Sequence, residues 1–111
     1  MGLVEPAAYG SLIRAVLEEY ARVAPSDGQV EAEVVADDVR GHYELLYVGW
    51  EGWRRVHGTV VHVDVRGDQI WIQHDGTEAG IADELIARGV DPRCIVLAFQ
   101  HPRMRERFAA G

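Results

Sequence analysis

The feature that most constrains the fold is a pair of apolar, β-branched segments joined by Gly67-Asp68. A glycine in the first central position suits a two-residue type II′ turn, so the segments predict a β-hairpin. Closing it there places apolar pairs on one face: Val65 with Ile70, Val63 with Ile72, and Val61 with His74. The other face then receives Arg66 with Gln69, Asp64 with Trp71, and His62 with Gln73. A slip by one residue would mix the two sets, so the pattern predicts this register.

Two further strands are predicted before this hairpin. Residues 30–37 alternate Val and Ala with acidic residues, which is the period of a strand with one solvent-facing side. Residues 42–50 (HYELLYVGW) are rich in aromatic and aliphatic residues, which favours an interior strand. A two-residue turn at Glu51-Gly52 would pair this strand with residues 54–65, and a longer turn is the alternative.

Two segments carry a helical period. Between Pro6 and Pro25, apolar residues recur at spacings of three and four, which predicts an amphipathic helix. A shorter apolar stripe over residues 81–86 predicts a second helix, and residues 95–99 (IVLAF) predict a last strand. The order predicts an α+β fold with a single domain over residues 1–111. We expect a twisted, mainly antiparallel sheet of about five strands with two main helices packed on it.

The charge distribution bears on the kind of partner. The formal net charge is −7, and the chain contains no lysine. Because duplex DNA is bound largely through Lys and Arg contacts to phosphates, this composition favours a protein partner over DNA alone. The single cysteine, Cys94, cannot form an intramolecular disulfide, and no apolar run approaches the roughly 20 residues that cross a bilayer. We therefore expect a soluble, cytoplasmic protein without a membrane segment.

Three blocks carry a family resemblance. They are HYELLYVGWEGWRRVHG (42–58), IWIQHDGTEAGIA (70–82) and ELIARGVDPRCIVLAF (84–99). In order and spacing they resemble the XisI family of fdxN element excision controlling factors, over nearly the whole chain. The resemblance implies an accessory role in the excision of a DNA element, known from cyanobacteria, with a nuclease-like XisH protein as partner. It implies no catalytic residues and no cofactor, so we predict a protein that is not an enzyme.

A mixed polar and aromatic face is the candidate partner-binding site. Aromatic and Arg side chains beside amides are typical of interface hot spots. The candidate residues are Arg54, His62, Asp64, Arg66, Trp71 and Gln73, joined by Tyr43 and Tyr47 if the first hairpin closes as predicted. Two alternatives remain: the helices cover this face and Trp71 is core, or the face mediates self-association.

Other chemistries find less support in the sequence. His57 and His62 point to opposite faces of their strand, as do His62 and His74 in the predicted hairpin. His62 and Asp64 share a face, but two ligands need a third from elsewhere, so we predict no metal site. Asp64, Asp75 and Glu78 are candidate carboxylates for a nuclease site, but such a site also needs a lysine and the chain has none. The alternative function is DNA binding by an arginine-rich tail, Arg103, Arg105 and Arg107, with the edge at Arg54 and Arg55.

Overall fold

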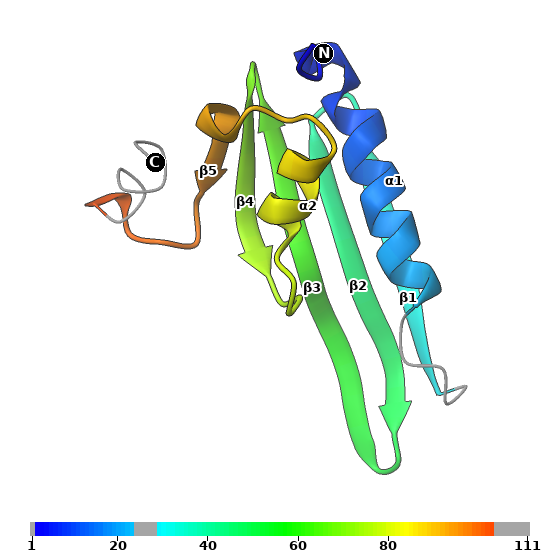
Figure 1. The fold of residues 1–111 in the computed structure, drawn as a ribbon. Coiled ribbons are helices and arrows are strands. Elements are labelled where there is room, and N and C mark those ends of the chain that lie inside the picture. The colour runs from blue at the N-terminus through cyan, green and yellow to red at the C-terminus, as the bar shows by residue number, and fades with distance from the viewer. Residues whose placement is uncertain (1, 24–28, 104–111) are drawn as a thin grey trace.

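The first predicted helix forms as α1, Tyr9–Arg22, preceded by one 3-10 turn, η1, Pro6–Ala8. Ile13, Val16 and Leu17 on its apolar stripe are fully buried. The computed structural model describes residues 2–23 and 29–103. Within them α1 packs on one side of the sheet (Figure 1). The charged residues of α1 are exposed, namely Arg14, Glu18, Glu19 and Arg22. The amphipathic pattern therefore fixes which side of α1 meets the sheet.

The sheet has five strands in the order in which they occur in the chain. The first four are antiparallel neighbours: β1, Val30–Asp37; β2, His42–Glu51; β3, Arg54–Arg66; and β4, Gln69–Asp75. They are followed by the helix α2, Ile81–Ala87, the turn η2, Pro92–Cys94, and the strand β5, Ile95–Leu97. Because β5 pairs parallel to β4, the sheet is mixed, and the predicted α+β fold is confirmed. β5 is shorter than the predicted segment 95–99.

The β3–β4 hairpin closes at Gly67-Asp68 as predicted. Gly67 has a φ of 62°, the conformation that the first position of a type II′ turn requires. Four predicted pairs near the turn form, namely Arg66–Gln69, Val65–Ile70, Asp64–Trp71 and Val63–Ile72. A β-bulge between His62 and Val63 then shifts the register by one residue, so the predicted pairs Val61–His74 and His62–Gln73 are wrong. Val61 instead lies opposite Asp75, and His62 opposite His74.

The β2–β3 hairpin differs from the prediction in two ways. Its turn is Gly52-Trp53, because Glu51 already pairs with Arg54. A β-bulge follows further along, where Leu46 pairs with Thr59 but Leu45 pairs with Val61. Because β3 carries this extra residue, the side chains of β3 beyond the bulge point to the opposite face from the one obtained by counting residues from the turn.

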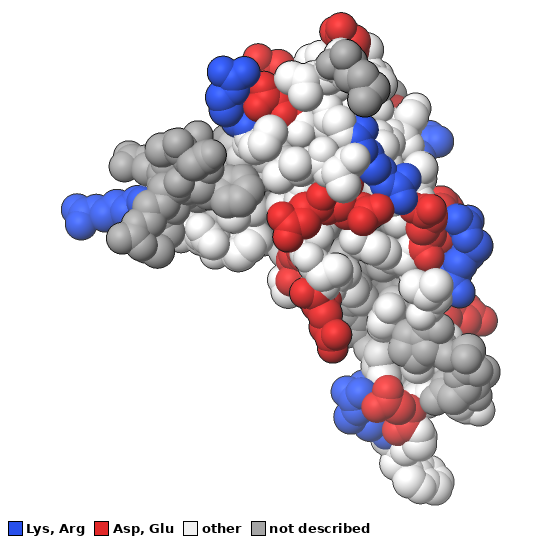
Figure 2. Space-filling view, in the orientation of Figure 1, with Lys and Arg blue, Asp and Glu red and all other residues white. Residues whose placement is uncertain are grey.

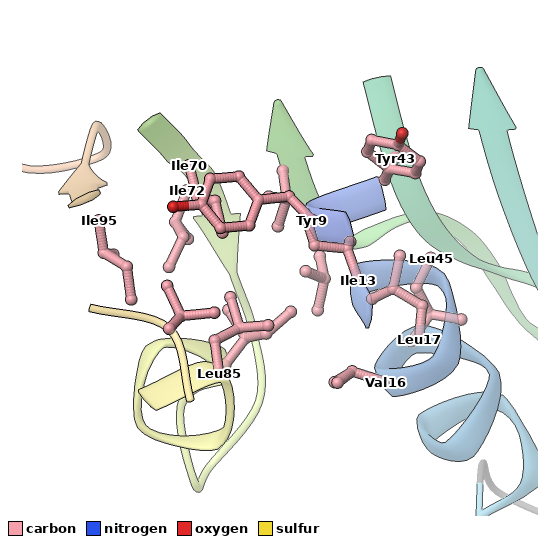
Figure 3. Close-up of a cluster of buried hydrophobic side chains, with 14 of the residues drawn as sticks. Tyr9, Ile13, Val16, Leu17, Tyr43, Leu45, Ile70, Ile72, Leu85 and Ile95 are labelled. Carbon is pink, nitrogen blue, oxygen red and sulfur yellow. The ribbon is translucent and has the colours of Figure 1, made fainter. Parts of the chain in front are cut away.

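The two helices cover one face of the sheet only. Figure 1 shows α1 and α2 on the same side, and Figure 3 shows Tyr9, Ile13 and Leu85 meeting side chains of the sheet. The sheet contributes these buried residues: Tyr43, Leu45, Val61, Val63, Ile70, Ile72, Ile95 and Leu97. Trp71 is not among them, so within the described residues the alternative in which the helices cover Trp71 is wrong. No helix in the described ranges is long and apolar enough to cross a membrane.

Candidate partner-binding face

We call the side of the sheet that faces away from α1 and α2 the open face. Five of the eight candidate residues lie on it in β3 and β4, between the buried positions of the same strands. They are His62, Asp64, Arg66, Trp71 and Gln73. The alternation of β3 and β4 therefore brings together the part of the candidate site that rests on the Gly67-Asp68 hairpin.

Asp64 and Trp71 organise this group of side chains. The guanidinium of Arg66 stacks over the Trp71 ring, 4.4 Å from its centroid, and lies 3.7 Å from Asp64 Oδ2. Gln73 Nε2 donates to the same Oδ2 at 3.1 Å, and Trp71 Nε1 donates to Gln69 Oε1 at 3.3 Å. The Asp64 side chain keeps 17% of its surface exposed. The result is a partly buried polar surface whose aromatic and Arg groups are held in place before any partner binds.

Two side chains of β2 join the candidate residues on the open face, and the sequence did not single them out. His42 lies opposite Asp64 in the register, and Glu44 lies opposite His62. His42 Nδ1 stands 3.2 Å from Asp64 Oδ1, and His62 Nε2 stands 3.0 Å from the same oxygen. The two imidazole rings tilt against each other with centroids 4.5 Å apart. The structure therefore brings a third potential metal ligand, His42, beside His62 and Asp64.

Glu44 holds His42 from the other side of the ring. His42 Nε2 lies 2.6 Å from Glu44 Oε2, and Thr59 Oγ1 donates to Glu44 Oε1 at 2.8 Å. The bond to His42 lowers the pKa of the Glu44 carboxyl, with the Thr59 hydroxyl adding to the effect. The same bond raises the pKa of His42, since the carboxylates of Glu44 and Asp64 favour the imidazolium while partial burial opposes it. His42 is thus fixed between two carboxylates.

Tyr43 and Tyr47 do not lie on the open face, and their predicted place there is wrong. Tyr43 pairs with Val63, is 2% exposed, and donates its hydroxyl to Asp38 Oδ1 at 2.7 Å. Tyr47 packs against the same core. The cause is the bulge in β3, which puts the odd-numbered residues of this part of β2 on the covered face.

Arg54 is also separated from the rest of the candidate site. It pairs with Glu51 beside the Gly52-Trp53 turn, and its guanidinium lies 2.6 Å from the Glu51 carboxylate. The bulge between this end of β3 and His62 breaks the common alternation on which the predicted place of Arg54 depended.

Asp75, one of the carboxylates weighed for a nuclease site, is engaged by the backbone. Its carboxylate accepts hydrogen bonds from the backbone N–H groups of Thr77 and Ile81.

The far end of the β2–β3 hairpin exposes two aromatic rings that the sequence did not assign to any site. This hairpin extends past the other elements of the sheet (Figure 1). Trp53 is 99% exposed and Trp50 is 46% exposed, with the Arg55 guanidinium 5.3 Å from the Trp50 ring. Neighbouring exposed tryptophans are uncommon on surfaces that bind no other molecule, so this end of the hairpin is a second candidate contact for a protein partner.

The arginine-rich tail lies mostly outside the described residues. Arg103 is described and exposed, whereas Arg105 and Arg107 are not described. On the helix-covered side, Figure 2 shows Asp and Glu side chains interspersed with Arg, and the described Arg residues on this side form no continuous basic surface. This view adds nothing in favour of the DNA-binding alternative.

Comparisons with known protein families and with solved structures point to the same family. The family described as "XisI protein" matches residues 4–110. A crystal structure of a XisI-like protein from Anabaena variabilis ATCC 29413 is similar, with 34% identity, a TM-score of 0.87, and coverage of 95% of this chain and 96% of that one.

A second crystal structure from the same organism is that of the fdxN element excision controlling factor XisI. It shares 30% identity with a TM-score of 0.73, covering 87% of this chain and 94% of the other. No protein with a curated description matches the chain.

Proposed function

The chain belongs to the XisI family, and we propose that it is a non-catalytic accessory protein that controls excision of a DNA element. In this proposal it acts in the cytoplasm by binding a nuclease-like XisH partner. The name of the similar Anabaena protein, an excision controlling factor, supports a regulatory role rather than one in bond cleavage. The acidic, lysine-free composition supports a protein partner.

The observation that carries the proposal is the open face itself. A five-stranded sheet buries one side under α1 and α2, and leaves Trp71, Arg66 and the His and Asp cluster uncovered by any described helix. Trp and Arg are the residue types that most often dominate binding energy at protein interfaces. Because Arg66 already stacks on Trp71, little side-chain entropy is lost when a partner covers the pair.

Co-expression with the XisH-type protein, followed by size-exclusion chromatography, tests the proposal. We expect the two chains to elute together at micromolar concentration, and this chain alone to elute separately at the position of its free form. Two separate peaks at that concentration would rule the proposal out. A larger free form would instead indicate self-association, and the proposal survives only if the partner displaces it.

A double variant, Arg66→Glu with Trp71→Ala, tests the assigned surface. It removes the stacked pair and should weaken the complex by on the order of 100-fold if both side chains are hot spots. Arg93→Glu with Val39→Ala is the matched control, because it reverses one charge and truncates one apolar side chain at exposed positions that belong to neither candidate contact. Equal weakening by both double variants would place the contact elsewhere. Circular dichroism of each variant confirms that the fold is retained.

The DNA-binding alternative has its own test. It attributes binding to Arg103, Arg105 and Arg107 and predicts salt-dependent retardation of duplex DNA, with a slope that falls when residues 103–111 are removed. The accessory role predicts no retardation by the chain alone at low salt.

A further inference from the structure

We propose that His42, His62 and Asp64 form a binding site for one divalent transition-metal ion of the Zn²⁺ class on the open face. The site goes beyond the accessory role and does not depend on it, because the chain supplies all three ligands by itself. Each residue offers one ligand atom, and the three atoms lie within 4.8 Å of one another. The pairing of β2 with β3, which places His42 opposite Asp64, brings them together.

The spacing of the ligand atoms fits a tetrahedral ion. Zn²⁺ binds imidazole nitrogen and carboxylate oxygen at about 2.0–2.2 Å, so neighbouring ligands in a tetrahedron stand roughly 3.3 Å apart. Asp64 Oδ1 lies 3.2 Å from His42 Nδ1 and 3.0 Å from His62 Nε2. Two of the three ligand separations are therefore near the required value, and the third, between the two histidine nitrogens, is within 4.8 Å.

Side chains around these ligands have the arrangement that orients metal ligands in proteins. A ligating His commonly donates its other ring N–H to a carboxylate, which fixes the tautomer. Glu44 Oε2 stands 2.6 Å from His42 Nε2, so a proton on Nε2 leaves Nδ1 free to bind an ion. Glu44 is itself held by Thr59, and the second oxygen of Asp64 accepts from Gln73 at 3.1 Å. Both carboxylates are thus fixed by neighbours that are not ligands.

The ligand types select the class of ion. Imidazole nitrogen favours Zn²⁺ and similar transition metals, whereas Mg²⁺ prefers sites made of oxygen and water alone. The three side chains are 36%, 28% and 17% exposed for His42, His62 and Asp64, so the cluster is reachable from solvent. A fourth coordination position is open for water, as in sites that have three protein ligands.

Arg66 provides a variant with the opposite effect. Its guanidinium lies 3.7 Å from Asp64 Oδ2 and repels a cation bound at Oδ1. Arg66→Gln should therefore strengthen Zn²⁺ binding severalfold. Zn²⁺ bound by a histidine elsewhere on the surface would not respond to this change.

Isothermal titration calorimetry of the purified full chain, stripped of metal with a chelator, tests the site with ZnCl₂ and MgCl₂. We expect one Zn²⁺ per chain with a Kd on the order of 1 μM or below, and no comparable heat with MgCl₂. Glu44→Gln keeps every ligand and should weaken binding about 10-fold. His42→Ala, His62→Ala and Asp64→Asn should each weaken it further.

His57→Ala is the matched control, because His57 is exposed on β3 outside the cluster. The site is supported if His57→Ala binds as the parent chain does while the ligand variants do not, and if bound Co²⁺ gives the visible spectrum of a four-coordinate ion. It is overturned if Zn²⁺ does not bind, or if binding survives in His42→Ala and His62→Ala. If a ligand variant fails to fold, the site is tested by Glu44→Gln and Arg66→Gln instead, which should lower and raise the Zn²⁺ affinity respectively. The site is overturned if neither affinity changes.

Discussion

Among single residues, Asp64 shapes the open face more than any other described side chain. One oxygen faces both His42 and His62, and the other is shared by Gln73 and Arg66. These contacts join β2, β3 and β4 across the side of the sheet that the helices leave uncovered. The proposed metal site and the proposed partner-binding face therefore share Asp64, and a change there is expected to affect both.

Tyr9 carries a pH dependence that belongs to the covered face. Burial raises the pKa of its phenol from 10.0 to about 12, and the adjacent Cys94 side chain adds to this. A raised pKa means that Tyr9 stabilises the fold fully below about pH 10 and loses this contribution as the pH rises towards 12. Tyr9→Phe should flatten the fall in the free energy of unfolding over this range, measured by urea denaturation at stepped pH. An unchanged slope would contradict the assignment.

Among the elements, the hairpin turn of β3 and β4 sets the register that creates the open face. Gly67 adopts a φ of 62°, which an L side chain resists, and nothing lies within 4 Å of an added Cβ. Gly67→Ala should therefore lower the free energy of unfolding by about 1–2 kcal/mol through backbone strain alone. Gly58→Ala in β3 is the control, since that position has equal space and no positive φ. Urea denaturation of both variants makes the comparison, and equal losses would contradict a strained turn.

The turn and the helices were predictable because each rests on local chemistry. Gly67-Asp68 offered glycine where a type II′ turn needs it, and the period of α1 fixed its buried stripe. The same rule applied to Gly52-Trp53 would have found the β2–β3 turn. The β-bulges had no local signal, since they arise from how strands of unequal length pair and twist. The bulge in β3 is what moved Tyr43 into the core and brought His42 and Glu44 to the open face.

The whole molecule is a two-layer structure, so adjacent residues of one strand should differ sharply in their effect on stability. Ile72 is fully buried under the helices, and Trp71 points to the open face. Ile72→Ala should cost about 2–5 kcal/mol of unfolding free energy. Trp71→Ala should cost clearly less, despite removing the larger side chain, because no described helix packs on it. Thermal and urea denaturation compare them, and an equal or larger loss for Trp71→Ala would mean that this face is covered.

The central claim is that the chain binds its XisH-type partner through the open face. The chain has three tryptophans, and they report on separate places: Trp71 on the open face, and Trp50 and Trp53 near the hairpin end. Titration of the ¹⁵N-labelled chain with the partner, followed by the three indole N–H signals, localises the contact in one measurement. The account predicts that the Trp71 signal shifts or broadens and saturates at one partner per chain. A complex that leaves the Trp71 signal unchanged, or moves only those of Trp50 and Trp53, would contradict it.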